Sequence, residues 1–418
     1  MNYVERYAYQ RFAGHSQNIL NLQAAVQMFR LSLFWGLAIP RGMVTKPQNN
    51  APHILIIGAG LIGLSTADAL QRRGAKVTIT EARPKPMRGT SYSNSGMVHP
   101  SQARPWGAAL SSVPDDPDFE RASKAVFDLA RMSQDLLRQN IQDLSKTDAL
   151  SQDVLSQSGS CYQIFEQSEP AYAAKEKYEA LGVQTALMSD HEKTLGYLAL
   201  HFPDDFGANA FTYGQALAAR LAENGAVFIY DAGDLRLRMG RSPSGGEAVT
   251  AQLRGHIFHA DHIIICAGPQ SGEVLSQLDI VLPLVNKRGF AVNFDKPDMV
   301  LPQAPIMDAQ THSALTVLGE TLRFSGTLGE QSAHPLLKRW YHLVPDIMRR
   351  LAPAREVWSG LRPLSPVGRP YIGPLSRSNL WVNTGHGHMG WTLCAGSGAL
   401  MADMVLEGVE DARFALSE

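Results

Sequence analysis

The most informative part of the sequence is a C-terminal stretch, residues 360–398, that combines an arginine with a glycine-rich loop. Arg362 directly precedes a proline, which restricts the backbone at this position. Gly385, Gly387 and Gly390 stand just before a helix-like run at 399–406. Glycines let a backbone approach a ligand closely, and a helix start presents free N–H groups and partial positive charge to anions. A guanidinium beside such a loop is typical of a flat, electron-rich cofactor that meets a carboxylate substrate.

A second glycine pattern lies near the other end of the chain, where Gly58, Gly60 and Gly63 match G-x-G-x-x-G. It follows a short apolar run, opens a helical run, and precedes an apolar segment that ends at Glu81. In a βαβ dinucleotide unit these glycines allow a tight turn, leave room for pyrophosphate and bring helix and strand together, while the acidic residue accepts hydrogen bonds from ribose. This pattern alone does not separate FAD from NAD. A cofactor contacted at both ends of a chain is long and deeply buried, which favours a tightly held flavin.

The segments between these two motifs alternate between helical and strand-like patterns. Helices are expected at 61–73, 119–145, 168–182, 213–223 and 335–351, and strands at 53–58, 76–81, 227–230 and 262–267, with an antiparallel pair within 236–259 and short strands through 282–328. βα units therefore lie at the start, middle and end of the chain, with strand-rich and helical segments inserted between them. This order predicts an α/β fold: a discontinuous FAD-binding Rossmann-like domain with an inserted, mainly antiparallel β-sheet substrate domain.

The predicted domain division has six segments. The FAD-binding domain takes residues 51–130, 206–280 and 356–418, the substrate domain takes 131–205 and 281–355, and residues 1–50 form an N-terminal leader that is helical or disordered. An apolar run at 24–39 in the leader is too short and too polar to indicate a membrane span. Three interpretations of the leader remain open: a peripheral membrane or partner helix, a disordered segment, or a start of translation at Met43.

Overall composition narrows the functional class. The 418 residues include 38 Lys and Arg against 39 Asp and Glu, so charge indicates no nucleic-acid partner. Cys161, Cys266 and Cys394 are scattered and form no CxxC pair, which predicts neither a disulfide framework nor a metal site. A reducing cytoplasm is the expected location, with the leader as a candidate contact to the inner face of the plasma membrane.

With both ends in view, the chain resembles the D-amino-acid-oxidase-like family of FAD-dependent oxidoreductases, and within it the group of bacterial D-amino acid dehydrogenases. The resemblance runs from about residue 52 to residue 408. It rests on six motifs, at 57–63 with Glu81, 90–96, 265–268, 360–363, 383–392 and 396–398. The blocks around Arg362 and the glycine loop are the specific ones, because many dinucleotide-binding proteins share the first. His388 and Met389 depart from the family pattern in a loop that faces the flavin.

The resemblance implies roles for the matching residues. It assigns contact with FAD to Gly58, Ala59, Gly60, Leu61, Ile62, Gly63, Glu81, Ala82, Thr90, Ser91, Asn94, Ser95, Gly96, Ala267, Gly268, Gly385, His386, Gly387, His388, Met389, Gly390, Trp391 and Thr392. It assigns the substrate carboxylate to Arg362, because a guanidinium can bind a carboxylate through two parallel hydrogen bonds. His386 is expected to position the flavin, with a role as catalytic base as the weaker alternative. Arg288 is a further candidate for the pocket wall, whereas Arg323 is expected to be a solvated strand residue.

The implied reaction is oxidative deamination of D-amino acids, in which a hydride passes from the α-carbon to the flavin and water hydrolyses the imino acid to a 2-oxo acid and ammonia. An FAD-dependent secondary-amine oxidase or dehydrogenase of the glycine, sarcosine or hydroxyproline type is the alternative, since it shares the fold and the arginine. A nucleic-acid-modifying flavoprotein and a redox-inactive binding module are further alternatives, and near-zero net charge disfavours the first of these. No motif separates an oxidase from a dehydrogenase. A quinone or another electron carrier is the expected partner of a dehydrogenase.

Overall fold

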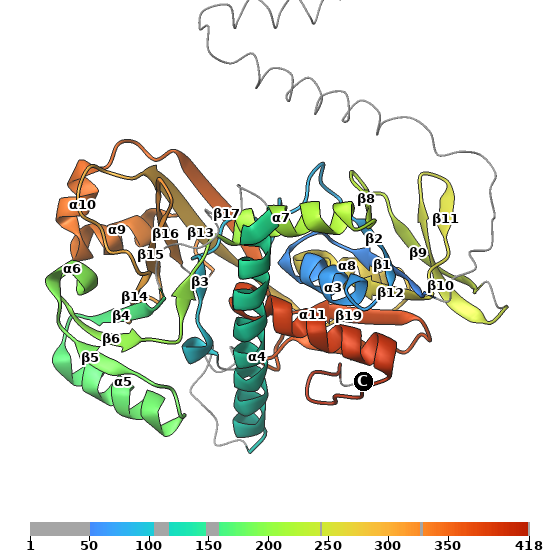
Figure 1. Cartoon of the computed structure of the whole chain (residues 1–418), viewed down its shortest axis with the longest axis horizontal. Coiled ribbons are helices and arrows are strands. Elements are labelled where there is room, and N and C mark those ends of the chain that lie inside the picture. The colour runs from blue at the N-terminus through green and yellow to red at the C-terminus, as the bar shows by residue number, and fades with distance from the viewer. Residues whose placement is uncertain (1–50, 104–116, 148–158, 243–244, 327–328, 417–418) are drawn as a thin grey trace, which may run out of the picture. The chain divides into compact units, whose positions relative to one another are not determined.

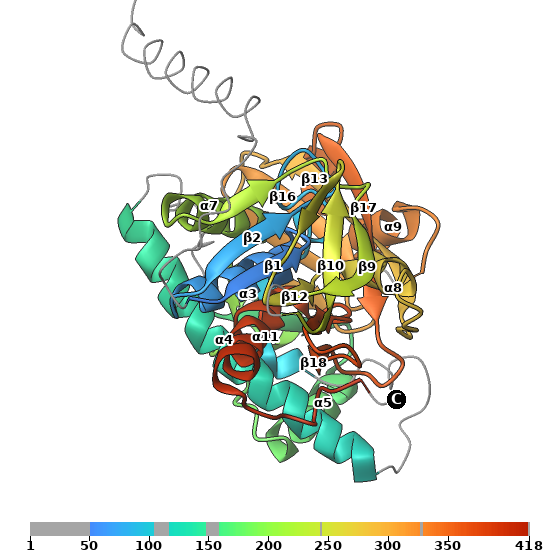
Figure 2. The same ribbon diagram turned by 90° about the vertical axis from the view of Figure 1, so that its right-hand side faces the viewer.

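A computed structural model describes residues 51–103, 117–147, 159–242, 245–326 and 329–416 of the chain (Figure 1; Figure 2). Residues 51–418 form one compact unit. The leader predicted at 1–50, with its apolar run and Met43, lies outside the described residues. Within the part of the chain that is described, no helix is long and apolar enough to cross a membrane.

The first sheet has six strands in the order β18-β19-β12-β1-β2-β8. Their bounds are β1 His53–Ile57, β2 Lys76–Thr80, β8 Val227–Ile229, β12 His262–Ile265, β18 Tyr371–Pro374 and β19 Leu380–Thr384. Neighbouring strands run parallel except β18, which is antiparallel to β19. Strands far apart in the sequence thus combine into one sheet, which confirms the predicted discontinuous α/β fold.

Alternate residues of β1 face two different layers. Ile54 and Ile56 pack against a layer of four helices, and Leu55 and Ile57 pack against a small sheet and a short helix. The four helices are α3 Leu61–Gln71, α4 Pro117–Thr147, α7 Ala210–Glu223 and α11 Gly390–Glu407. The opposite layer consists of β9 Arg236–Arg241, β10 Glu247–Leu253, β11 His256–Phe258 and α8 Ser271–Ser276. A strand buried on both faces is continuously apolar, which explains why this segment predicted a parallel strand.

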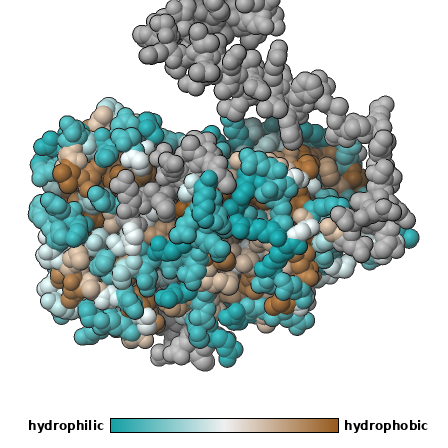
Figure 3. Space-filling model, in the orientation of Figure 1, coloured by the Kyte–Doolittle hydropathy of each residue, from teal (hydrophilic) through white to brown (hydrophobic). Residues whose placement is uncertain are grey.

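Helix α4 covers α11 on the outside of the helical layer. Its residues Leu137, Ile141 and Leu144 are buried, as their helical spacing predicts. The face that α4 turns to solvent is largely hydrophilic (Figure 3). The predicted long amphipathic helix is therefore confirmed.

The second sheet has eight strands in the order β17-β13-β16-β15-β14-β4-β6-β5. Their bounds are β4 Cys161–Phe165, β5 Ala186–Met188, β6 Leu198–Phe202, β13 Val285–Asp295, β14 Ile306–Asp308, β15 Ala314–Leu318, β16 Thr321–Gly326 and β17 Glu356–Leu364. All pairs are antiparallel except β14 with β4, which confirms the mainly antiparallel second sheet. Strand β17 pairs in this sheet, although its residues were predicted in the FAD-binding domain; the division into domains stays a prediction.

Short elements complete the fold. Helices α9 His334–Leu343 and α10 Pro345–Arg350 cover one face of the second sheet through Trp340 and Ile347, and α5 Ser168–Ala180 packs on β4 and β6. The remaining small elements are β3 Met97–Val98, β7 Phe206–Gly207, α6 His191–Thr194 and the 3-10 helices Thr90–Tyr92, Pro100–Gln102 and Gly268–Gln270.

Three predicted elements differ from the structure for local reasons. The segment 236–259 forms three strands instead of two, because Arg254 and Gly255 both adopt positive φ and reverse the chain once more. The predicted helix at 335–351 is two helices, because Pro345 lacks the N–H that would continue the first.

The last helix was predicted too short. It begins at Gly390 instead of near residue 399. A Cβ at Gly396 would lie 2.8 Å from the Leu129 carbonyl oxygen, and one at Gly398 would lie 2.6 Å from the Ser65 carbonyl oxygen. These glycines therefore let α11 pack closely on α4 and α3, although glycine lowers helix propensity and masked the helix in the sequence.

Candidate cofactor and substrate site

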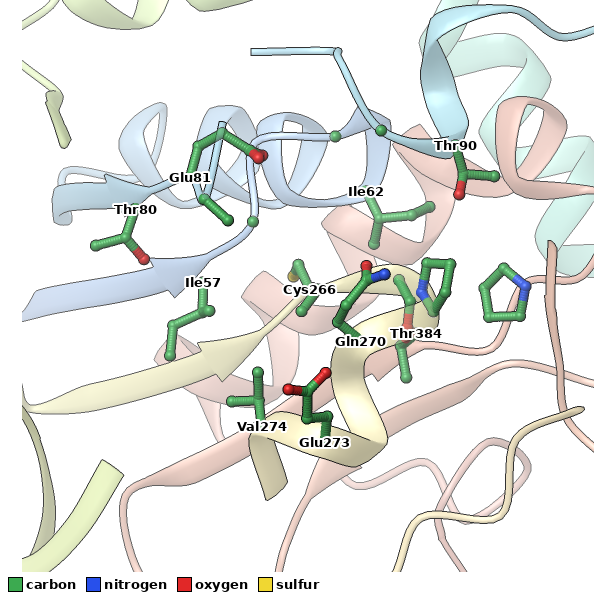
Figure 4. A pocket seen from close by; sticks show the side chains of 18 of the residues that line it. Ile57, Ile62, Thr80, Glu81, Thr90, Cys266, Gln270, Glu273, Val274 and Thr384 are labelled. Carbon is green, nitrogen blue, oxygen red and sulfur yellow. The ribbon is translucent and has the colours of Figure 1, made fainter. Parts of the chain in front are cut away.

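A first cavity, of about 500 Å³, lies at the carboxyl ends of the parallel strands of the first sheet. Its walls come from residues at or just beyond the ends of β1, β2, β12 and β19, with further residues from the segment after β8 and from α8. Figure 4 shows Glu81 and Thr90 towards opposite ends of this cavity. Open α/β sheets bind ligands at this edge, so the cavity lies where a dinucleotide would be expected.

The glycine pattern has the geometry that a dinucleotide turn requires. Gly58 has a φ of +112°, and a Cβ there would lie 2.5 Å from the Cys266 carbonyl oxygen. A Cβ at Gly63 would lie 1.9 Å from the Gly58 carbonyl oxygen, so only glycine allows α3 to pack this close to the turn. The Leu61 N–H at the start of α3 donates to Ser91 Oγ (3.1 Å). The N-terminus of α3 therefore lies at the cavity, where its partial charge favours an anion.

Glu81 is buried at the end of β2 and lines the first cavity. One carboxylate oxygen accepts a hydrogen bond from the Ala59 N–H (3.0 Å), and the other accepts one from the Arg83 N–H (3.0 Å). These bonds fix the orientation of the carboxylate and tie it to the glycine turn. A carboxylate has about four acceptor positions, so Glu81 can also accept hydrogen bonds from ribose hydroxyls.

The opposite wall holds two buried polar atoms with no hydrogen-bond partner among the described residues, Asn383 Oδ1 and His386 Nε2. Asn383 is held in place because its Nδ2 donates to Thr66 Oγ1 (3.0 Å) and to the Ser397 carbonyl (3.3 Å). Buried polar atoms are nearly always hydrogen-bonded, so both fit a polar ligand in the cavity. Burial lowers the pKa of His386 to about 3, which makes it a very weak base.

The two halves of the C-terminal motif meet in space. The Gly387 N–H donates to the Pro363 carbonyl (2.8 Å), which connects the glycine loop to the strand that carries Arg362. Gly387 and Gly390 line the first cavity and also a second, smaller one. Helix α11 has 18 residues and begins at Gly390, so its positive end lies at this junction.

The second cavity, of about 140 Å³, is adjacent to the first, since Ile62, Thr90 and Ser91 also line both. Its outer wall consists of residues from β13, β16 and β17 of the second sheet, and Arg362 is one of them. The junction of the two sheets therefore contains a cofactor-sized space next to a substrate-sized one.

Arg362 is held against the backbone of the neighbouring strand. A Cβ at Gly289 would lie 2.4 Å from Cζ of Arg362, so the guanidinium covers this glycine. Its Nη2 donates to the Gly326 carbonyl at the long distance of 3.4 Å. Enclosure by protein lowers the pKa of Arg362 to about 10, which still leaves the guanidinium charged at neutral pH. A carboxylate that binds there would compensate an enclosed positive charge.

The segment 90–96 is fixed between the two cavities by bonds to its backbone and side chains. Thr90 Oγ1 donates to the Leu361 carbonyl (2.7 Å), and Thr316 Oγ1 donates to the Ser95 carbonyl (2.8 Å). Arg323 donates through Nη1 to the Asn94 carbonyl (2.9 Å) and through Nε to Asn293 Oδ1 (2.8 Å). Arg323 is 8% exposed, so the expectation of a solvated residue was wrong. Its hydrogen bond to the Asn94 carbonyl helps to hold segment 90–96 in place.

Most of the predicted site residues line one of the cavities. The first cavity includes Gly58, Gly60, Ile62, Glu81, Ala82, Thr90, Ser91, Ala267, Gly268, His386, Gly387 and Gly390. The second includes Leu61, Asn94, Ser95, His388, Trp391 and Arg362. Ala59, Gly63, Gly96, Gly385, Met389 and Thr392 line neither. Arg288 also lies apart, because its neighbour in register is Leu361 while Lys287 pairs with Arg362, which puts Arg288 on the opposite face of β13.

Several lining residues were not predicted. They are Arg83, Ala232, Gly233, Arg236, Gln270 and Glu273 in the first cavity, and His99, Phe290, His312 and Trp358 in the second. Ala232 and Gly233 follow β8, so the carboxyl-end rule for parallel strands could have found them. Arg83 and Gln270 likewise follow β2 and β12 within a few residues. The others carried no local signal, because long-range packing brings them to the site. Among the described residues, no three His, Cys, Asp or Glu side chains are placed to hold a metal ion.

Comparisons with known proteins agree with this geometry. A family model described as "FAD dependent oxidoreductase" matches residues 53–404. A curated protein named D-amino acid dehydrogenase, from Bradyrhizobium diazoefficiens, is 30% identical over 403 residues, which is 84% of this chain and 94% of that protein. The glycine oxidase structure from Geobacillus kaustophilus matches with a TM-score of 0.71 at 21% identity, covering 88% of this chain and 99% of that one. The iminodiacetate oxidase structure from Chelativorans sp. BNC1 matches with a TM-score of 0.70 at 19% identity, covering 87% of this chain and 98% of that one. The two structures show the same fold.

Proposed function

This chain belongs to the family of FAD-dependent oxidoreductases, and we propose that it oxidises D-amino acids at the α-carbon to give 2-oxo acids and ammonia. The observation that carries this proposal is the place of Arg362, which lines a small cavity that shares five of its lining residues, Ile62, Thr90, Ser91, Gly387 and Gly390, with the larger first cavity. The curated relative named D-amino acid dehydrogenase supports the substrate class.

The residues around the first cavity fit FAD. The Gly58 turn and the N-terminus of α3 suit a pyrophosphate, and the Glu81 carboxylate suits ribose hydroxyls. Asn383 Oδ1 and His386 Nε2 are buried polar atoms that can pair with a ligand in this cavity. When bound, FAD accepts the hydride that leaves the substrate. The protein supplies binding, orientation and electrostatics.

Arg362 would orient the substrate. Two parallel hydrogen bonds from the guanidinium fix both the position and the plane of the α-carboxylate. The backbone at Gly289 supports the guanidinium from one side, so it has little freedom to follow a misplaced substrate. The anchored segment 90–96 and the start of α11 provide residues that line both cavities, so they lie where the two cavities meet. Such positioning contributes to catalysis without a side-chain base.

His386 would act by position and not as a base. Its pKa of about 3 means that the imidazole is uncharged at neutral pH and is a very weak base. Efficient base catalysis needs a pKa near the working pH. We therefore propose that the ring packs beside the cofactor, as the sequence predicted.

The electron acceptor is a further part of the proposal. We propose that electrons pass to a quinone or another carrier, that the enzyme works in the cytoplasm, and that residues 1–50 provide contact with the inner face of the plasma membrane. Dye reduction that is much faster than peroxide release would support a dehydrogenase. Removal of residues 1–50 should then abolish co-sedimentation with vesicles of anionic lipid; unchanged sedimentation would contradict the role of the leader.

An anaerobic panel of substrates tests the reaction. Purified holoenzyme is mixed with D-amino acids, their L-enantiomers, glycine, sarcosine and hydroxyproline, and loss of flavin absorbance is followed. We expect D-amino acids to bleach the flavin faster than their enantiomers. Faster bleaching by sarcosine or hydroxyproline would replace this function with the secondary-amine alternative. A flavin that no amine bleaches would contradict both.

A further inference from the structure

The second cavity gathers three imidazole side chains around Arg362. His99 directly precedes the short helix Pro100–Gln102, His312 lies in the turn after β14, and His388 lies in the loop before α11. The charges of His99, Arg362 and His312 all act on His388, so the four groups lie close together. Among the described residues that line this cavity there is no Asp, Glu or Lys. The described part of its wall can therefore donate hydrogen bonds to an anion and contributes no carboxylate.

Three buried polar atoms of residues that line this cavity, one of them on His99, have no hydrogen-bond partner among the described residues: Ser93 Oγ, His99 Nδ1 and Ser325 Oγ. His99 is only 8% exposed, and its backbone N–H donates to Thr392 Oγ1 (3.2 Å). This bond fixes the position of the backbone that carries the imidazole. Native proteins rarely leave several buried polar atoms unpaired in one place. Their grouping at the cavity indicates a ligand with more hydrogen-bonding groups than one α-carboxylate.

The turn that carries His312 is held rigidly. His312 has a positive φ of 50°, which is uncommon for residues other than glycine, and its N–H donates to the Asp308 carbonyl (2.9 Å). The Asp308 carboxylate accepts hydrogen bonds from the Thr311 N–H (3.1 Å) and from Arg339 through Nε (2.8 Å) and Nη2 (2.7 Å). Strained residues that a network holds in place are concentrated at functional sites. The strain here presents an imidazole to the cavity.

We propose that His99, His312 and His388 form a subsite for a second carboxylate, so that the preferred substrates are amino acids that carry two carboxylates. This inference rests on the proposed function, in which Arg362 holds the α-carboxylate. The second carboxylate is attached either to the side chain or to the amine nitrogen, and both arrangements share the same chemistry. A neutral side chain would leave the polar atoms of Ser93, His99 and Ser325 buried beside apolar atoms.

Proton uptake can complete the subsite. Burial lowers the pKa of His99 to about 4, and enclosure together with the neighbouring positive charges lowers that of His388 to about 3. A carboxylate in contact with an imidazole acts in the opposite direction, because it favours the charged form. A second carboxylate on the substrate would thus favour uptake of a proton from solvent by an imidazole, which would then form a charge-assisted hydrogen bond with the carboxylate.

Isosteric substrate pairs test this inference on the intact holoenzyme. Steady-state turnover with an artificial dye is compared for D-glutamate with D-glutamine, D-aspartate with D-asparagine, and N-carboxymethylglycine with N-carbamoylmethylglycine. We expect kcat/KM for the preferred dianion to exceed that of its neutral partner by about tenfold or more, the size of one charge-assisted hydrogen bond. The pair with the larger ratio shows where the second carboxylate is attached. Equal or better reduction by the neutral partners would overturn the subsite while the proposed function stands. No reduction by any compound would overturn both.

A matched pair of variants locates the effect. His312→Asn keeps a residue type that tolerates the positive φ, and His256→Asn changes an exposed histidine on β11 that lines neither cavity. We expect His312→Asn to lower the ratio of dianion to neutral kcat/KM by about tenfold, whereas His256→Asn keeps the ratio of the unchanged protein. The ratio does not depend on the fraction of folded, FAD-loaded enzyme. An equal loss for both members of a pair would show that His312 serves the cofactor or the fold, which contradicts the subsite.

Discussion

Gly289 offers a precise way to displace the guanidinium of Arg362 without removing it. A Cβ at Gly289 would lie 2.4 Å from Cζ and 2.5 Å from both terminal nitrogens of Arg362. Favourable contacts between heavy atoms lie at about 3.5–4.0 Å, so Gly289→Ala must move the guanidinium by about 1 Å. The guanidinium is the far end of a flexible side chain, so it can move while the backbone of β13 and β17 stays paired.

The expected loss follows from this displacement. A shift of about 1 Å in a group that positions the substrate costs on the order of 100-fold in rate. We therefore expect kcat/KM for the best D-amino acid to fall about 100-fold, which corresponds to about 2.7 kcal/mol. FAD content and the thermal midpoint should change little, because Gly289 lies in the second cavity only.

Steady-state kinetics with an artificial dye, together with the flavin spectrum, measures this effect. Gly272→Ala is the matched control, since a Cβ there meets the Leu282 carbonyl oxygen at an ordinary 3.5 Å and the residue lines neither cavity. We expect the control to keep full activity. A Gly289→Ala enzyme with unchanged kcat/KM would refute the idea that the guanidinium at this position holds the substrate.

Three further predictions concern the cofactor and the fold. Glu81→Ala removes the carboxylate that accepts from the Ala59 N–H and, in the proposal, from the ribose hydroxyls, so FAD affinity should weaken by about 10- to 100-fold. Fluorescence of released FAD measures the affinity, and an unchanged value would contradict the role of Glu81. Arg339→Met leaves the buried Asp308 carboxylate without its arginine partner and should lower the free energy of unfolding by about 3 kcal/mol. Lys124→Ala, which breaks an exposed ion pair, should lower it by less than about 1 kcal/mol. Similar losses for the two variants in urea unfolding would contradict this role of Arg339. Gly396→Ala places a Cβ 2.8 Å from the Leu129 carbonyl oxygen and should cost about 1–3 kcal/mol, and a variant as stable as the original chain would disagree with the packing of α11 on α4.

The Asp308 effect should depend on pH. Burial alone would raise the pKa of this carboxyl, but hydrogen bonds from Arg339 and Thr311 outweigh burial and lower the pKa. A lowered folded pKa gives stability that is present above the unfolded pKa, near about 3.9 for Asp, and is lost as the pH falls through the folded value. The difference in unfolding free energy between Arg339→Met and the original chain should therefore shrink as the pH falls into and through that acidic range.

The first βαβ unit could be predicted almost completely from the sequence. Most of its signals are local: a strand buried on both faces is continuously apolar, and Gly63 is required by its close contact with the Gly58 carbonyl oxygen, whereas Gly58 also faces the distant Cys266 carbonyl oxygen. Glu81 follows at the spacing that the strand and helix lengths impose. Constraints between residues that are close in the sequence can be recognised from the sequence alone.

The substrate side could be predicted only in part. Arg362 was found because its motif is specific, but the strand that carries it pairs in the second sheet, since hydrogen bonding to β13 is a long-range choice. The face to which Arg288 points depended on that register. His99 and His312 come from distant segments and carried no pattern, so only long-range packing brings them to the cavity.

The account depends most directly on what Arg362 binds. Anaerobic single-turnover reduction of the flavin by the best D-amino acid should be compared for the original chain, Arg362→Met and Arg288→Met, the last of which changes an arginine on the opposite face of β13. Loss of a bidentate charged contact predicts that the Kd for the substrate rises about 100-fold in Arg362→Met, with FAD retained, and stays unchanged in Arg288→Met. An unchanged Kd in an FAD-loaded Arg362→Met enzyme would contradict the account.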